Sequence, residues 1–132
     1  MRYLFDTHTW VWWNADPGKL SPRLRRLLSD RIGNTELLVS CASVWEFCRW
    51  LQEGRLALSR AAEEWIEKAL DAPGLRLAPL TPRIAYQATV LPSPFQGDSI
   101  DAILAATARE ENAVLLTKDE RLLSYRHVRS LW

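Results

Sequence analysis

The sequence contains few of the residues that hold small proteins together covalently or through zinc. It has two cysteines and two histidines in 132 residues. Cys41 and Cys48 have no CxxC partner, and His8 and His127 lie near opposite ends of the chain. These spacings exclude a disulfide framework and a zinc site of the finger type, so we expect the cysteines to be small core residues.

Long apolar runs and a strong charge of either sign are also missing. The apolar run Trp10–Trp13 is far too short to cross a bilayer, and no charged leader with a cleavable apolar segment precedes it. We therefore expect a cytoplasmic protein without a membrane partner. With 17 Lys and Arg against 16 Asp and Glu, the net charge is +1, so any contact with RNA must come from local patches or bound metal ions.

Several short catalytic motifs are absent as well. The chain has no GxxxxGK[ST], GxGxxG, GxSxG or HExxH sequence. A P-loop, a dinucleotide fingerprint, a serine-hydrolase elbow and a zincin helix are therefore excluded, although an enzyme without such a motif is not.

Short apolar runs alternate with segments of helical periodicity. The runs that fit buried strands are Arg2–Phe5, Glu36–Ser40, Leu75–Leu80, Val114–Thr117 and Val128–Trp132. Helix starts are indicated at Ser21 before Pro22, at Ser43 three residues before Glu46, at Ser59, at Thr81 before Pro82, and for a helix over Ser99–Asn112. This alternation predicts one α/β domain over residues 1–132, with a mostly parallel sheet of about five strands covered by helices on both faces.

Acidic residues fall where the predicted strands end and the next helices begin. Asp6 follows the first strand, Glu46 the second and Asp119 the fourth, whereas Asp98 and Asp101 open the helix after a proline-rich loop. Because the carboxyl ends of parallel strands meet at one edge of a sheet, these side chains are expected to converge.

Each acid taken singly has a simpler explanation, since acids are common at helix N-termini. Glu46 could complete a solvent-facing capping box begun by Ser43, and Thr117 with Glu120 could form a second box beside Asp119. Capping needs only one acid for each helix, however, and does not require convergence. Two carboxylates about 4 Å apart repel by roughly 4 kcal/mol at an effective dielectric near 20, so such a cluster takes up protons or binds a cation.

The chemistry that follows is metal-dependent hydrolysis of a phosphodiester. Carboxylate oxygens without thiolates select Mg²⁺ or Mn²⁺ over zinc or copper. Such an ion can acidify a bound water and neutralise charge on the leaving oxygen.

The chain also resembles a known family over essentially its whole length. The strings that carry the resemblance are Tyr3–His8 (YLFDTH), Ser40–Phe47 (SCASVWEF), Gly97–Ala102 (GDSIDA) and Leu115–Asp119 (LLTKD), in this order and spacing. They resemble the PIN-domain ribonucleases, specifically the VapC-like toxins of toxin-antitoxin pairs. The resemblance implies a PIN-like three-layer fold, an RNA substrate, a VapB-like antitoxin and a homodimer.

The resemblance also implies roles for individual residues. Asp6, Glu46, Asp101 and Asp119 match the catalytic, Mg²⁺- or Mn²⁺-binding quartet. Outside that quartet lie Asp98, an additional acid, and the hydroxyls of Thr7 and Thr117, which could orient the carboxylates of the quartet by hydrogen bonds. Where close relatives often read Arg-Asp-Pro-Phe-Asp-Arg around Asp98, this chain has Gly97, Ser99 and Ala102, which puts the RNA-contacting surface in question more than the metal site.

Seven tryptophans are more than a core of this size easily holds. We expect Trp65 and Trp132 in the core. For Trp10, Trp12, Trp13 and Trp50, a partner-binding surface is as good an interpretation as core packing.

Two other functions remain as hypotheses. A PIN fold that has lost catalysis would be an RNA- or protein-binding module, but it should lack one of the four acids. A phosphoacceptor receiver domain would need adjacent acids after the first strand and an Asp at the end of the third, and neither is present.

Overall fold

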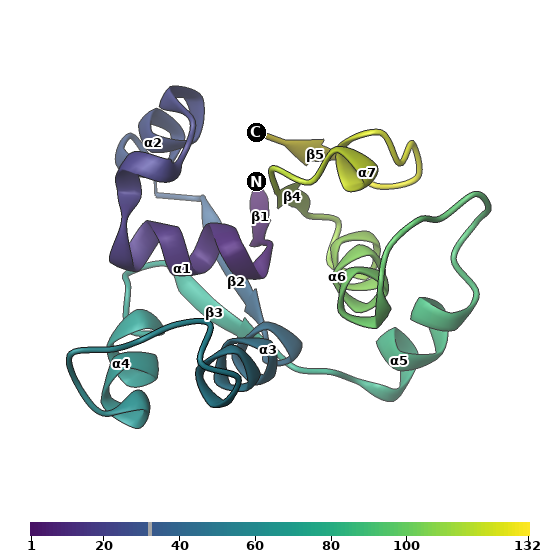
Figure 1. Ribbon diagram of the computed structural model, residues 1–132. Helices are drawn as coiled ribbons and strands as arrows, with labels where there is room; N and C mark the ends of the chain where they lie inside the picture. Colours follow the sequence, from purple (N-terminus) through teal and green to yellow (C-terminus); the bar gives the residue numbers. More distant parts are fainter. Residues whose placement is uncertain (32) are drawn as a thin grey trace.

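A five-stranded parallel sheet forms the middle layer of the protein. The computed structural model describes residues 1–31 and 33–132. Its strands are β1 (Arg2–Phe5), β2 (Glu36–Ser40), β3 (Leu75–Ala78), β4 (Val114–Leu116) and β5 (Ser130–Leu131). They pair in the order β3-β2-β1-β4-β5, and all four pairings are parallel (Figure 1). The predicted parallel sheet is confirmed, with shorter third, fourth and fifth strands.

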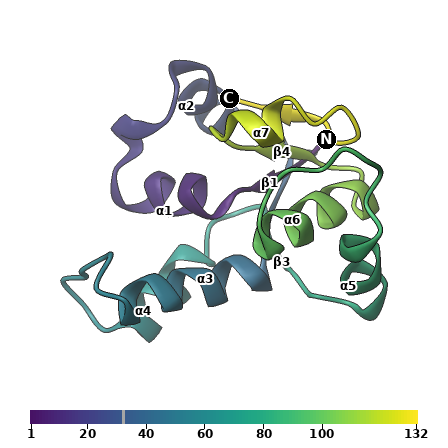
Figure 2. The same ribbon diagram turned by 45° about the vertical axis from the view of Figure 1, so that its right-hand side comes forward.

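Helices cover both faces of this sheet (Figures 1 and 2). They are α1 (Thr7–Ala15), α2 (Pro22–Ser29), α3 (Cys41–Gln52), α4 (Ala62–Ala69), α5 (Pro82–Thr89), α6 (Ser99–Glu110) and α7 (Glu120–Leu123), with a 3₁₀ turn at Pro17–Lys19. The predicted three-layer α/β architecture is therefore confirmed. In the part of the chain that the structure describes, no helix is both long and apolar enough to cross a membrane.

Side chains that alternate along the strands divide the core into two parts. Phe5 and Val39 face a large aromatic cluster formed with helices α1 to α4. Leu4 and Leu38, their chain neighbours, face α6, where Ala105 and other small residues let the helix approach the sheet closely.

Two of the four predicted cap residues occupy the positions expected. The Ser21 hydroxyl accepts a hydrogen bond from the Leu24 N–H at 3.1 Å, and the Thr81 hydroxyl accepts one from the Ile84 N–H at 3.1 Å. In both helices a proline follows the cap directly, where its fixed φ suits the first helical position.

The other two cap predictions are wrong. β2 runs into α3 without a loop, so Ser40 ends the strand and caps the helix, and Ser43 lies buried inside α3. The fourth helix begins at Ala62 rather than beside Ser59, and its cap position, Ala61, makes no side-chain bond.

Candidate active site

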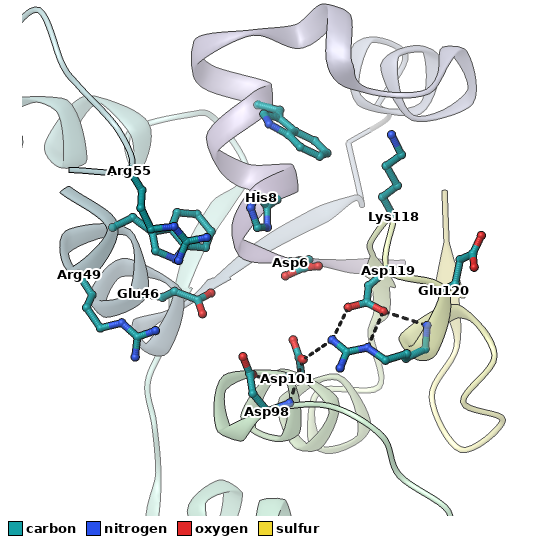
Figure 3. A pocket seen from close by; sticks show the side chains of 13 residues that line it. Asp6, His8, Glu46, Arg49, Arg55, Asp98, Asp101, Lys118, Asp119 and Glu120 are labelled. Carbon is teal, nitrogen blue, oxygen red and sulfur yellow. Dashed lines mark hydrogen bonds and ion pairs between the residues drawn. The ribbon is translucent and has the colours of Figure 1, made fainter. Parts of the chain in front are cut away.

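A cavity of about 540 Å³ opens at the carboxyl edge of the sheet, where parallel α/β folds place their ligands. Five predicted acids line it: Asp6, Glu46, Asp98, Asp101 and Asp119. Figure 3 shows that they reach the cavity from the segments that follow β1 and β4, from the second turn of α3 and from the start of α6. The structure therefore brings together the acids that the sequence placed at separate junctions.

Asp6 is fixed at the end of β1 by two hydrogen bonds. Its Oδ1 accepts one from the Thr7 N–H at 2.7 Å, and its Oδ2 accepts one from the Thr117 hydroxyl at 2.7 Å. The same hydroxyl accepts the Asp119 N–H at 3.0 Å, so Thr117 links two of the predicted ligands. Burial raises the pKa of Asp6, and the bonds from Thr117 and Thr7 partly oppose the rise.

Glu46 lies in α3 and is only 9% exposed. Its burial contradicts the alternative of a solvent-facing capping box begun by Ser43. Instead, the Thr7 hydroxyl donates to the Ser43 hydroxyl at 2.9 Å and ties the start of α1 to α3. Burial raises the pKa of Glu46, the Thr7 hydroxyl opposes the rise, and the carboxylates of Asp98 and Asp6 add to it.

Asp98 and Asp101 form a reciprocal capping box at the start of α6. Asp98 Oδ1 accepts the Asp101 N–H at 2.9 Å, and Asp101 Oδ2 accepts the Asp98 N–H at 3.1 Å. Asp98 is exposed at the cap position, whereas the Asp101 side chain is only 14% exposed. Burial raises the pKa of Asp101 to about 7, with smaller contributions in the same direction from Asp98, Asp6 and Asp119.

Asp119 is bound to an arginine two residues further on. It caps α7 by accepting the Arg121 N–H at 2.8 Å, which contradicts the alternative of a capping box formed by Thr117 and Glu120. The guanidinium of Arg121 donates to Asp119 Oδ2 at 2.8 Å, and this bond holds the pKa of Asp119 below its usual value. The same Nη2 lies 3.3 Å from Asp101 Oδ2.

These donors suit a hard divalent cation, because the cavity floor offers carboxylate oxygens and no thiolate. Burial and the neighbouring carboxylates raise the pKa of Asp101 and Glu46, so a bound cation would stabilise the charged forms of these side chains. Within residues 1–31 and 33–132, however, no three acidic, His or Cys side chains are already close enough together to hold an ion. An ion would have to draw the carboxylates together.

Apart from Glu120, basic and aromatic side chains form the rest of the cavity wall, and most of these were not predicted from the sequence. His8, Arg49, Arg55 and Lys118 line it, the first three from α1, α3 and the segment after α3 (Figure 3). The His8 ring lies 4.4 Å from the Trp50 ring, and burial lowers the pKa of His8. A signal for His8 was present in the sequence, since it lies two residues after Asp6 at the start of a helix.

A PIN domain family model matches residues 3–128 of the chain. The chain belongs to the PIN-domain family. It is 37% identical over 127 residues to Ribonuclease VapC22 of Mycobacterium tuberculosis, covering 96% of this chain and 93% of that protein.

Solved structures share this PIN fold at low sequence identity. VapBC2 from Rickettsia felis, bound to a DNA fragment from its promoter, matches with a TM-score of 0.73 at 15% identity and covers 99% of this chain and 98% of its own. VapC20 of Mycobacterium tuberculosis, a toxin that cleaves the sarcin-ricin loop, matches with a TM-score of 0.62 at 20% identity and covers 96% of this chain and 98% of its own.

The tryptophans of this PIN domain are distributed differently from the prediction. Trp10 is fully buried and Trp50 is 4% exposed, so neither offers a free surface to a partner. Trp12, Trp13, Trp65 and Trp132 are half-buried around the aromatic core. Trp45, which the sequence did not single out, is 56% exposed.

Gly97, which replaces the first Arg of the Arg-Asp-Pro-Phe-Asp-Arg pattern, lies at a crowded point of this PIN domain. A Cβ atom at this position would lie 2.8 Å from Asp101 Cβ and 3.0 Å from its Oδ2. The loop therefore passes so close to Asp101 that any side chain at position 97 would push the Asp101 side chain away. The glycine lets the backbone cover one side of that carboxylate.

Proposed function

We propose that this chain is a VapC-like endoribonuclease that depends on Mg²⁺ or Mn²⁺ and is inhibited by a VapB-like antitoxin. The observation that carries the proposal is the placement of Asp6, Glu46, Asp101 and Asp119 around one cavity in a PIN domain. None of the four acids is missing, which disfavours a catalytically silent module. The relative named Ribonuclease VapC22 supports the ribonuclease assignment.

The chain's residues divide this work by position. Asp6, Glu46, Asp101 and Asp119 would hold the cation, which would supply an acidified water and neutralise the leaving oxygen. Thr117 orients Asp6 through its 2.7 Å hydrogen bond. Arg49, Arg55 and Lys118 offer positive charge around the cavity, and such side chains bind a nucleic-acid backbone without reading its sequence.

Cleavage of structured RNA by the purified protein tests the catalytic part. We expect cleavage with Mg²⁺ or Mn²⁺ and none with excess chelator, and we expect Asp6→Asn to be inactive because an amide is a poor ligand for these ions. Asn retains the capping ability of Asp, so a cooperative unfolding transition would confirm that the variant folds. RNA binding without metal-dependent cleavage would favour the silent module instead.

The antitoxin part rests on the structural neighbours, which include a complex named VapBC2, and on half-buried indoles beside the cavity. Trp12 lines the cavity and packs edge-on against Trp132, with 6.1 Å between ring centroids. We expect Trp12→Ser to weaken association with a VapB-like antitoxin. Tyr86→Ser, at an aromatic residue that is 62% exposed on α5, is the matched control.

A second copy of this chain is the other proposed partner. Sedimentation of the Trp12→Ser and Trp13→Ser variants without the antitoxin measures whether the chain still forms a dimer. It therefore distinguishes an indole that binds the second copy from one that binds the antitoxin. If neither variant changes antitoxin association or the dimer, these indoles serve only the fold.

A further inference from the structure

Arg121 is placed between two of the predicted metal ligands. Its Nη2 lies 2.8 Å from Asp119 Oδ2 and 3.3 Å from Asp101 Oδ2, and its Nε lies 3.2 Å from Asp119 Oδ1. The two acids come from different parts of the chain, one capping α7 and the other in the first turn of α6. A single guanidinium thus joins the two acids across the cavity.

The other two arginines around the cavity are engaged elsewhere. Arg49 lies over the Trp45 ring at 5.2 Å and pairs with Glu53, and Arg55 lies over the Trp50 ring at 5.2 Å. Among the ion pairs of the described residues, only those of Arg121 reach the acids of the proposed quartet. Arg121 is therefore the counter-ion that the chain itself supplies to this site.

This arrangement conflicts with a bound divalent ion. The guanidinium uses oxygens of Asp101 and Asp119 that the ion needs, and the two positive charges repel each other at this distance. The described carboxylates are also not yet gathered into a cage. Binding of an ion therefore requires the Arg121 side chain to leave the space between the two acids.

Arg121 is able to leave, because its side chain is 51% exposed. Its backbone stays in place, since the Arg121 N–H donates to Asp119 Oδ1 at 2.8 Å as part of the helix cap. A released guanidinium would therefore remain at the rim of the same cavity. There the best ligand for its planar fork of donors is a phosphate, which it can bind through two parallel hydrogen bonds.

We propose that Arg121 exchanges between two anionic partners: it neutralises Asp101 and Asp119 when no divalent ion is bound, and it binds an RNA phosphate once an ion has displaced it. The inference rests on the proposed function, because it assumes that these acids bind the metal. It assigns Arg121 a role in substrate binding and makes metal affinity depend on a residue that is not a ligand.

Magnesium titration of the full-length protein, without RNA, tests the displacement. The side-chain Nε–H resonance of Arg121, assigned by its loss in Arg121→Gln, should shift as Mg²⁺ binds, whereas that of Arg126 should not. By calorimetry, Arg121→Gln should bind Mg²⁺ about tenfold more tightly than the unmodified protein, which corresponds to about 1.4 kcal/mol.

Two further variants control for charge. Arg126→Gln makes the same change in net charge at an exposed arginine that does not line the cavity, so its Mg²⁺ affinity should stay unchanged. Arg121→Lys keeps the charge but loses the two-pronged geometry, so its affinity should lie between those of the unmodified protein and Arg121→Gln.

The phosphate contact is tested by the dependence of RNA cleavage on Mg²⁺ concentration. Arg121→Gln should reach half of its maximal rate at less Mg²⁺ but should have a raised KM for RNA. An unchanged KM would overturn the phosphate contact.

The possible failures are distinguishable. If Mg²⁺ saturates the protein while the Arg121 resonance and the affinity of Arg121→Gln stay unchanged, the exchange is wrong and the proposed function stands. If neither protein binds Mg²⁺ or Mn²⁺, the proposed metal site itself is wrong.

Discussion

Two clusters of charged side chains lie at opposite ends of the same sheet, and they differ in how their charges are compensated. At the amino edge, two arginines meet two glutamates: Arg76 lies 2.6 Å from Glu36 and 2.9 Å from Glu111, and Arg2 lies 3.3 Å from each. At the carboxyl edge, six acids line one cavity, and Arg121 alone forms ion pairs with the proposed quartet among the described residues.

The pKa values respond in opposite directions. The hydrogen bond from Arg76 lowers the pKa of Glu36 at the amino edge. Burial raises the pKa of Asp6, Glu46 and Asp101 at the carboxyl edge. Exposed ion pairs with balanced charges need only a structural explanation, whereas desolvated acids that outnumber their one paired arginine indicate a site that binds a cation.

The largest expected effect separates the two acids of the α6 capping box. Asp101→Asn should lower metal-dependent RNA cleavage at least about 100-fold, because even residues that only orient ligands cost 10- to 100-fold. Asp98→Asn should retain measurable cleavage, since Asp98 is exposed at the helix end and Asn also caps well. Initial rates at saturating Mg²⁺ provide the measurement.

The assignment of the two acids can be reversed by the same assay. If Asp98→Asn were as inactive as Asp6→Asn while Asp101→Asn cleaved RNA normally, Asp98 would be the ligand. Unfolding curves of both variants would show whether a loss of activity comes from a loss of fold.

The next expected effect is a pH dependence of opposite sign at the two edges. An acid with a raised pKa binds its proton more tightly in the folded state, so its contribution to stability is lost as pH rises. Without divalent ions, the free energy of unfolding should fall between about pH 4 and pH 7, because burial raises the pKa of Asp6 and raises that of Asp101 to about 7. Asp101→Asn should flatten this slope, which denaturant titrations in excess chelator would measure.

Glu36 should act in the other direction. Its pKa is lowered by Arg76, so its contribution to stability is present above its ordinary pKa and is lost as pH falls through the lowered value.

Adding Mg²⁺ at tenfold its Kd should stabilise the protein at pH 7 by about 1.4 kcal/mol. A metal-free stability that rose steadily from pH 4 to pH 7 would contradict the desolvation of the carboxyl edge.

The sequence predicted the backbone of the site better than its side-chain contacts. Strand ends follow from short apolar runs, and the rule that parallel strands end at one edge was enough to bring Asp6, Glu46 and Asp119 together. The burial of Trp10 could not be predicted in this way. Its ring packs against Phe47 and Trp65, which belong to helices far along the chain.

Local sequence patterns were misleading where a helix followed a strand without a loop. They also could not reveal an ion pair between residues of two different helices. Ser43 and Glu46 have the spacing of a capping box, but α3 starts at Cys41, so both lie inside the helix. The contact of Arg121 with Asp101 joins residues from α7 and α6. Only the arrangement of the sheet and helices shows that this arginine reaches that acid.

The smallest expected effect is at the amino edge, and it tests the comparison from the other side. Glu36→Gln removes the carboxylate that faces Arg76 and Arg2, both of which are more than 40% exposed. Exposed ion pairs are each worth about 0.2–1 kcal/mol, so the loss in unfolding free energy at pH 7 should stay near this range. The loss should shrink at high salt, since screening weakens such pairs.

RNA cleavage and Mg²⁺ affinity should stay unchanged in this variant, because Glu36 lies at the start of β2 and the cavity lies beyond the other end of that strand. A Glu36→Gln variant with the inactivity expected of Asp101→Asn would show that charge compensation does not distinguish the structural edge from the functional one.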